Sequence, residues 1–232
     1  MGVFAGPDVV EDGLVLALDA GNTKSYPGSG TTWTDLSGNG NNGTLTNMDG
    51  TNFNSANGGS LTFDGTNEYV NCGNPSSLNF GTGNFTLSFV TYTTAYGLQG
   101  GSYVGKGNGT TIGFDFRDYN FYVTGTLGLI ARGSFAATLN VWQIHTIVYD
   151  SSSSPYVKFY INGTYTGAST TNNPANISSI TTSEPFRIGL SVAGGLSRYF
   201  NGRIPSVQVY NRALTASEIQ QNFNALRGRF GI

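Results

Sequence analysis

Large apolar residues alternate with smaller or polar ones in short runs along most of this chain, and glycine and asparagine separate the runs. In Asn84–Tyr92, Phe85, Leu87 and Phe89 fall on every second position. A period of two is the pattern of a strand that buries one of its faces. We therefore predict a half-buried strand at Asn84–Tyr92.

The same criteria predict strands along most of the sequence. The pair Asn162-Gly163 separates two such runs, and it predicts a type I′ hairpin turn because both residues tolerate positive φ. The other predicted strands are Leu14–Leu18, Ser60–Phe63, Tyr69–Cys72, Ser102–Gly105, Ile112–Phe116, Phe121–Thr124, Trp142–Tyr149, the two arms of Tyr156–Gly167, Phe186–Leu190 and Ile204–Tyr210. Many short strands joined by tight turns indicate an all-β sandwich or barrel.

One segment, Thr215–Arg227, has the signals of a short helix. Thr215 and Glu218 form a capping box, in which each side chain satisfies a backbone N–H of the other residue. Gly228 follows at the position where helices commonly stop. Three apolar residues fall on one helical face: Ile219, Phe223 and Leu226. We predict that this face packs against the β-structure.

The sequence predicts one domain with an N-terminal arm. Residues 1–12 lack a strand or helix pattern, and we expect them to form an arm that the fold does not need. No linker divides residues 13–232, so they are predicted to form a single domain that includes the helix at 215–227. A chain of 232 residues can bury a large core without disulfides, and the lone cysteine, Cys72, is predicted to be a small buried residue.

Charge and hydropathy exclude several classes of protein. Only 10% of the residues are charged, the net charge is −2, and the 11 Lys and Arg are scattered, so no nucleic-acid partner is predicted. No apolar run reaches the roughly 20 residues of a membrane-spanning helix, so no membrane insertion is predicted. The start, MGVFAGPDVVEDG, has no basic and apolar leader pattern, and we expect no signal peptide and synthesis in a cytoplasm.

Four segments of the chain resemble the concanavalin A-like, laminin G-like lectin family. They follow the family's order: LDAGN…WTDLSGNGNNGTL at 18–45, LTFDGTNEYVNCG at 61–73, WQIHTIVYD…VKFYINGTYTG at 142–167 and GRIPSVQVYNRALTASEI at 202–219. The resemblance implies a jelly-roll β-sandwich of two antiparallel sheets. This architecture agrees with the strands and the single C-terminal helix predicted from the sequence pattern.

The two ends of the sequence also resemble domains of tailed-phage structural proteins. The resembling segments are DGLVLALDAGN with SYPGSGTTW, and NRALTASEIQQNFNALRGRFGI. This resemblance implies a non-enzymatic virion component of the head, tail or fibre. Its partners would be other virion proteins and a host-surface glycan, and it would be a homo-oligomer. The alternatives are a cellular carbohydrate-binding or adhesion module and a glycoside hydrolase.

The sequence gives no catalytic residues. Glycosidases of this fold carry Glu-x-Asp-x-x-Glu, which is absent, and retaining hydrolysis needs two carboxylates roughly 5 Å apart. Asp115 and Asp118 come nearest, but a spacing of three places them on opposite faces of a strand, and we expect a solvated loop end. The single histidine, His145, lies within a strand pattern and is predicted to be a packed strand residue.

A calcium site is implied by the family resemblance. Asp64, Asn67 and Glu68 match the patch after the FDG loop that often holds calcium in the family, and oxygen ligands suit this ion. Relatives commonly supply an Asp-Glu pair from a later strand, where this chain has Pro205-Ser206. Two interpretations stay open: a calcium site, or an aspartate that forms a turn. No cofactor is required.

Glycan binding would use exposed aromatic rings that stack on sugar faces. Four tyrosines lie in or near glycine-rich connections and are the candidates for this role: Tyr96, Tyr119, Tyr122 and Tyr199.

Overall fold

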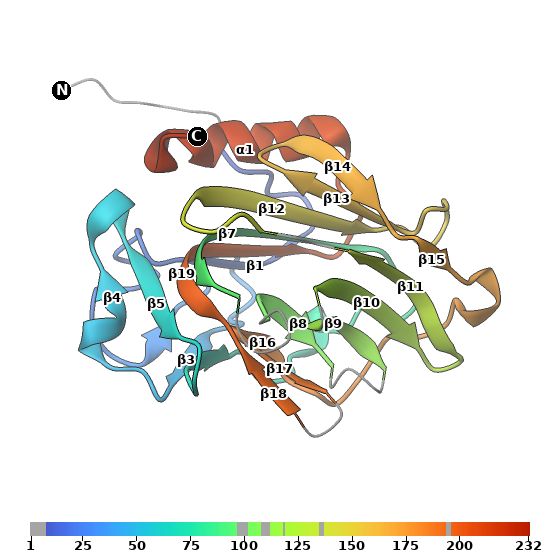
Figure 1. The fold of residues 1–232 in the computed structure, drawn as a ribbon, viewed down its shortest axis with the longest axis horizontal. Coiled ribbons are helices and arrows are strands. Elements are labelled where there is room, and N and C mark those ends of the chain that lie inside the picture. The colour runs from blue at the N-terminus through green and yellow to red at the C-terminus, as the bar shows by residue number, and fades with distance from the viewer. Residues whose placement is uncertain (1–7, 97–101, 108–111, 118, 135–136, 194–195) are drawn as a thin grey trace.

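The structure, a computed structural model, describes residues 8–96, 102–107, 112–117, 119–134, 137–193 and 196–232. Within these residues, two antiparallel sheets pack face to face, and one helix lies against the outer side of one of them (Figure 1). This architecture confirms the predicted all-β, two-sheet sandwich with a C-terminal helix.

The eight-stranded sheet of the described residues is called sheet A here. In spatial order its strands are β14 (Thr164–Ala168), β13 (Val157–Ile161), β12 (Trp142–Tyr149), β7 (Phe85–Ala95), β19 (Asn201–Tyr210), β5 (Ser60–Asp64) and β4 (Phe53–Asn54), and β1 (Leu14–Asp19) also pairs with β19. One edge of β19 pairs with β7, while its other edge pairs with β5 and then with β1. The last strand of the chain therefore joins the first strand to the centre of the sheet.

Sheet B, with nine strands among the described residues, forms the second layer. Its spatial order is β15 (Thr171–Asn172), β11 (Gly128–Ser134), β10 (Asn120–Gly125), β9 (Gly113–Arg117), β8 (Val104–Lys106), β16 (Phe186–Ile188), β6 (Tyr69–Asn71), β3 (Gly43–Thr46) and β2 (Thr32–Trp33). A separate hairpin consists of β17 (Leu190–Ala193) and β18 (Leu196–Tyr199). Short 3₁₀ helices occupy Gly50–Asn52, Ala56–Gly58, Ser76–Leu78 and Pro174–Asn176.

Most predicted strands are present, and the hairpin prediction is confirmed: Asn162 and Gly163 have φ of 51° and 75° between β13 and β14. Sequence reasoning missed β2, β3, β4, β11, β15 and the β17–β18 hairpin. The strand β11 contains Gly128 and Gly133. Gly133 is required by packing, because a Cβ atom there would lie 2.5 Å from the Phe159 ring.

The core lies between the sheets and is rich in aromatic rings. Phe85 of sheet A and Phe114 of sheet B stack with centroids 4.5 Å apart. Burial raises the pKa of Cys72 to about 12, so this thiol is an inert core residue, as predicted. His145 is fully buried, its Nε2 lies 3.0 Å from Thr91 Oγ1, and burial lowers its pKa to about 3. The prediction of a packed, hydrogen-bonded strand histidine is confirmed.

Helix α1 (Ala216–Phe230) covers the outer face of sheet A (Figure 1). Its apolar residues pack on the outward side chains of β7, β12 and β19, such as Val90, Ile144 and Tyr210. As a result, Thr86, Ser88 and Val90 of β7 are all buried. The prediction of a half-buried strand at Asn84–Tyr92 is therefore wrong, because the helix closes the face that the alternation assigned to solvent.

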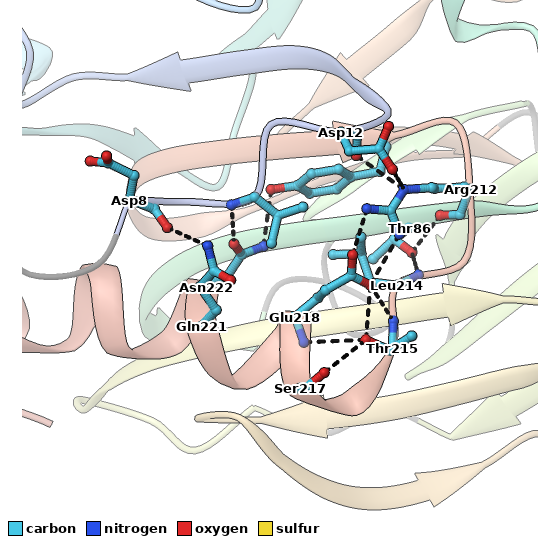
Figure 2. A network of polar contacts seen from close by, with 12 residues as sticks. Asp8, Asp12, Thr86, Arg212, Leu214, Thr215, Ser217, Glu218, Gln221 and Asn222 are labelled. Carbon is cyan, nitrogen blue, oxygen red and sulfur yellow. Dashed lines mark hydrogen bonds and ion pairs between the residues drawn. The ribbon is translucent and has the colours of Figure 1, made fainter.

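Polar contacts fix the start of this helix (Figure 2). Thr215 caps the helix, and its Oγ1 accepts a bond from the Glu218 N–H, while Glu218 accepts one from the Thr215 N–H, so the predicted capping box is confirmed. Arg212 donates to both oxygens of Glu218, at 2.6 and 3.0 Å. The helix runs past Gly228, where we predicted its end, to Phe230, with Gly231 in the left-handed conformation as its C-cap.

The N-terminal segment is attached to the same helix from Asp8 onward (Figure 2). The Val10 N–H donates to Asn222 Oδ1 at 2.8 Å, and Gln221 donates to the Asp8 carbonyl at 2.8 Å. Val10 is buried against Ile219 and Tyr210. Residues 8–12 are thus part of the domain, which corrects the predicted boundary at residue 13; the rest of the predicted arm, 1–7, lies outside the described residues.

No helix in the described part of the chain is long and apolar enough to cross a membrane.

Candidate functional site

The outer face of sheet B is the polar face of the sandwich. The strand pairings align one outward-facing row across the sheet, and its side chains are polar except for one glycine. From β2 to β11 the row is Thr32, Thr44, Asn71, Arg187, Gly105, Asp115, Tyr122 and Arg132. Adjacent strands lie about 4.8 Å apart, so neighbouring members of the row can contact a common ligand.

The β17–β18 hairpin crosses the middle of this face (Figure 1), where β17 packs on β8 and β9. Ser191 Oγ donates to Asp115 Oδ2 at 2.9 Å, and Asp115 is only 4% exposed. The expectation of a solvated loop end is wrong for Asp115, because a hairpin distant in sequence covers its carboxylate; Asp118 lies outside the described residues. The hairpin divides the face into two parts.

On one side of the hairpin, the face carries Tyr122 and Arg132. The two residues are cross-strand partners on β10 and β11, and the Arg132 guanidinium carbon lies 5.9 Å from the centroid of the Tyr122 ring. This separation is typical of a cation–π contact. Arg132 is exposed and Tyr122 is half-buried.

Two more of the predicted tyrosines lie close together: Tyr96, which follows the C-terminal end of β7, and Tyr119, which lies between β9 and β10. The rings of Tyr96 and Tyr119 meet edge to face, with centroids 5.7 Å apart. Tyr96 is 43% exposed and Tyr119 is 49% exposed, and Tyr96 Oη donates to the Ala137 carbonyl at 2.7 Å. Tyr119 has a φ of 60°, which the turn imposes. The two residues form a fixed, exposed aromatic pair, called the tyrosine pair below.

The tyrosine pair and Tyr122 belong to one region, because the turn that holds Tyr119 leads directly into β10. Tyr199 lies elsewhere, on β18, where it is half-buried and pairs with Leu190. Sequence reasoning thus selected three tyrosines of one region and a fourth on the β17–β18 hairpin. It missed Arg132, whose only signal was an alternating position on a strand that we did not predict.

A depression of about 350 Å³ lies on the other side of the hairpin, over β3 and β6. Its lining consists of Asn42, Thr44, Thr46, Asn71, Cys72 and Gly73. Sequence reasoning missed this depression too, because its polar residues come from two strands that are distant in sequence and β3 was not predicted. These amides and hydroxyls can exchange hydrogen bonds with a polar, uncharged ligand.

The residues proposed for calcium form a hydrogen-bonded turn. Asp64 Oδ1 accepts from the backbone N–H groups of Thr66 and Asn67, at 2.7 and 3.3 Å. Both oxygens of Glu68 also accept, from the Asn52 amide at 2.7 Å and from the Asp64 N–H at 2.6 Å. A cation would compete with these donors for the same oxygens, so the arrangement fits a turn better than a calcium ligand set.

Among the described residues, no cluster of three or more His, Cys, Asp or Glu could hold a metal ion. Calcium can also be bound by asparagine and backbone oxygens, which such a cluster does not include. Calcium binding at Asp64, Asn67 and Glu68 therefore stays a prediction.

Residues 64–220 match the sequence model of the concanavalin A-like lectin/glucanase superfamily. The match covers more than half of the chain. The chain therefore belongs to the concanavalin A-like lectin/glucanase superfamily. No curated protein matches it by sequence.

Solved structures share the fold. The binding domain of Paraclostridial Mosquitocidal Protein 1 superposes with a TM-score of 0.66 and 19% identity over 93% of this chain and 52% of its own. The binding domain of botulinum neurotoxin DC in complex with SialylT superposes with a TM-score of 0.63 and 17% identity, over 93% of this chain and 52% of its own. A third structure is domain 4 of AbnA, an extracellular arabinanase from Geobacillus stearothermophilus, in complex with arabinotriose. It superposes with a TM-score of 0.60 and 17% identity, over 91% of this chain and 98% of its own.

The chain spans about half the length of the two toxin binding domains and nearly all of AbnA domain 4. At identities below 20%, these likenesses show the fold alone.

Proposed function

We propose that this chain is a lectin-like domain that binds carbohydrate through the tyrosine pair. The observation that carries the proposal is the pair itself: Tyr96 and Tyr119 are both close to half exposed, and they are held in one arrangement by their edge-to-face contact and by the bond to Ala137. Aromatic rings give large contact areas to the apolar faces of sugars, and a ring already fixed in place loses little entropy on binding.

Tyr122 and Arg132 extend this surface along β10 and β11. The Tyr122 hydroxyl can donate or accept a hydrogen bond, and the Arg132 guanidinium donates several, so the two supply the polar contacts that orient a sugar. A guanidinium also favours a carboxylate-bearing sugar, because it forms bidentate bonds with carboxylates. Two structures of the same fold, AbnA domain 4 and the neurotoxin DC binding domain, were solved with arabinotriose and with SialylT, respectively.

The proposed activity is binding rather than hydrolysis. Asp115, the carboxylate nearest to a glycosidase pattern, is buried beneath the β17–β18 hairpin and accepts a hydrogen bond from Ser191. A retaining glycosidase needs two accessible carboxylates roughly 5 Å apart on either side of the scissile bond. We therefore assign Asp115 a structural role, which is to hold the hairpin on sheet B.

A glycan array followed by calorimetric titration of the strongest ligand tests this proposal. Replacing either tyrosine (Tyr96→Ala or Tyr119→Ala) should weaken binding by roughly fivefold, the equivalent of about 1 kcal/mol for an aromatic contact. Tyr165→Ala is the matched control, because Tyr165 is 54% exposed on β14, in the other sheet. An array without signal, or equal affinity in the wild type and in the Tyr96→Ala/Tyr119→Ala variant, would overturn the proposal.

We propose further that the domain works as a component of a tailed-phage virion, where other virion proteins hold it and its glycan ligand lies on the host surface. The support is the resemblance of the two ends of the sequence to phage structural proteins. Stoichiometric copurification with intact particles is the expected result. Glycan binding by a protein absent from particles would favour a cellular adhesion module instead, and a monodisperse monomer in solution would contradict the predicted homo-oligomer.

A further inference from the structure

We infer that the depression over β3 and β6 is a second carbohydrate site, specific for a neutral hexopyranose and separate from the tyrosine pair. The inference extends the proposed function to a different place on the domain. The depression lies on the opposite side of the β17–β18 hairpin from Tyr122 and Arg132. Asn71 on β6 and Tyr122 on β10 are separated by four strand steps, roughly 19 Å at the usual strand spacing.

Two asparagines in this depression are oriented by the backbone. Asn71 Oδ1 accepts from the Gly73 N–H at 2.9 Å, and Asn42 Oδ1 accepts from the Asp35 N–H at 2.9 Å. Each bond fixes the amide so that Nδ2 remains as a donor. Within the part of the chain that the structure describes, neither Nδ2 has a protein acceptor. The depression therefore contains two amide donors that are already oriented for a ligand.

Two threonines complete the polar lining. Thr44 is exposed and Thr46 is half-buried on the outward side of β3, and Thr44 is the cross-strand partner of Asn71. Each hydroxyl can donate or accept, so the four side chains can match a ligand that presents several hydroxyl groups. A polyol suits this mixture of fixed donors and rotatable hydroxyls better than a carbonyl-only or apolar ligand.

The charge and the volume of the depression restrict the class of ligand further. None of the six lining residues is charged. The adjacent Arg187, the cross-strand partner of Asn71, is already ion-paired to Glu184 at 3.0 Å, so an anionic ligand would compete with Glu184 for it. The lining also lacks an aromatic ring, so recognition would come from hydrogen bonds to ring hydroxyls rather than from stacking. A volume of about 350 Å³ is at the lower end of small-molecule sites, which accommodates one or two sugar rings.

The test is an NMR titration of the ¹⁵N-labelled full chain with methyl glycosides of glucose, galactose and mannose. At least one of these sugars should shift the backbone amides of residues 42–46 and 71–73. Asn71→Asp keeps the oxygen that accepts from Gly73 and replaces the Nδ2 donor by an acceptor of equal size. This variant should weaken binding by at least about tenfold, since a ligand hydroxyl loses its partner.

Asn54→Asp is the matched control, because Asn54 Oδ1 also accepts from the N–H two residues on, that of Ala56, at 2.9 Å, but lies outside the depression. It should bind like the wild type. A second variant, Thr44→Trp, fills the depression at an exposed strand position that tolerates aromatic residues, and it should abolish the shifts.

The two sites are distinguished by their variants. The Tyr96→Ala/Tyr119→Ala chain should keep the hexose shifts at residues 42–46 and 71–73, whatever the result for the tyrosine pair. The inference is overturned if none of the three glycosides shifts these amides, if Asn71→Asp binds as tightly as Asn54→Asp, or if the shifts cluster at the tyrosine pair alone.

Discussion

Strands β7 and β10 have the same alternating sequence pattern but different surroundings. In β10, the inward residues are buried, while Asn120, Tyr122 and Thr124 remain half-buried on the outer face of sheet B. In β7, the corresponding outward residues are as buried as the inward ones, because helix α1 covers them. Helix α1 thus closes the outer face of sheet A (the closed face). On the outer face of sheet B (the open face), the β17–β18 hairpin packs on β8 and β9 and leaves β10 partly exposed.

Two outward residues of β7, Thr86 and Ser88, carry hydroxyl groups that form buried hydrogen bonds beneath the covering segment. Thr86 Oγ1 donates to the Arg212 carbonyl at 2.8 Å and accepts from the Leu214 N–H at 3.0 Å, which lie 126 and 128 residues away (Figure 2). Ser88 Oγ lies 3.2 Å from Thr146 Oγ1 on the neighbouring strand. A polar residue in an alternating strand pattern can therefore mark a buried hydrogen bond as readily as contact with solvent.

The largest effect should come from weakening the closed face. Ile219→Ala removes a buried side chain of α1 that packs with Val148 and Tyr210, and it should lower the free energy of unfolding by about 2–5 kcal/mol. Leu127→Ala is the control, because Leu127 is exposed beyond the end of β10 and should cost less than about 0.5 kcal/mol. Urea unfolding measures both; equal costs would mean that α1 contributes little to the closure.

The same substitution made on the two strands gives a sharper test. Thr86→Val leaves the Leu214 N–H and the Arg212 carbonyl without their partner in a buried place, and it should cost about 1–3 kcal/mol. Thr124→Val on β10 removes a hydroxyl that water can replace, and it should cost less than about 0.5 kcal/mol. Similar losses in the two variants, measured by thermal or urea unfolding, would contradict the difference between the faces.

Much of the fold was predictable from local pattern. The alternating runs, the Asn162-Gly163 turn and the capping box at Thr215 each specify a local geometry within a few residues, and the structure has all three. The double burial of β7 was not predictable in this way. It depends on where a helix from the end of the chain comes to lie, which no window around Phe85–Ala95 contains.

In the candidate sites, too, single residues could be predicted from the sequence, whereas their spatial arrangement depends on tertiary packing. Tyr96 and Tyr119 could be selected as ring-bearing residues near glycine-rich connections, but their edge-to-face contact arises only when the end of β7 meets the β9–β10 turn. The depression over β3 and β6 combines Asn42 and Thr44 with Asn71, which strand pairing brings together. Burial of Asp115 beneath a later hairpin is the opposite case, in which tertiary packing removes an expected exposed acid.

Acid should lower the free energy of unfolding by weakening the ion pair between Arg212 and Glu218 at the start of helix α1. The hydrogen bonds from Arg212, together with those from Thr215, lower the pKa of Glu218 to about 2 from its ordinary value of 4.5. A carboxyl with a lowered pKa stabilises the fold at pH above 4.5, and this contribution is lost as the pH falls from 4.5 toward 2. Solvent screens this partly exposed pair, so the loss should be about 1 kcal/mol.

Glu218→Gln isolates that contribution. Relative to the wild type, the variant should be less stable at pH 6, and the difference should shrink as the pH falls below 4.5 and vanish near pH 2. The buried His145 charges on unfolding in both proteins, so its own acid effect cancels in the difference. A difference that stays constant down to pH 2 would show that Glu218 acts through packing rather than through its charge.

The smallest effect on stability should come from the open face. Tyr122→Leu removes the ring beneath Arg132, and an exposed cation–π contact contributes about 0.5–1 kcal/mol, part of which the leucine recovers by covering the same strand. We expect a loss below about 0.5 kcal/mol in urea unfolding. A loss as large as that of Thr86→Val would mean that Tyr122 is a packing residue of a covered face. With the expected small loss, any weakening of glycan binding in Tyr122→Leu reports contact with the ligand rather than damage to the fold.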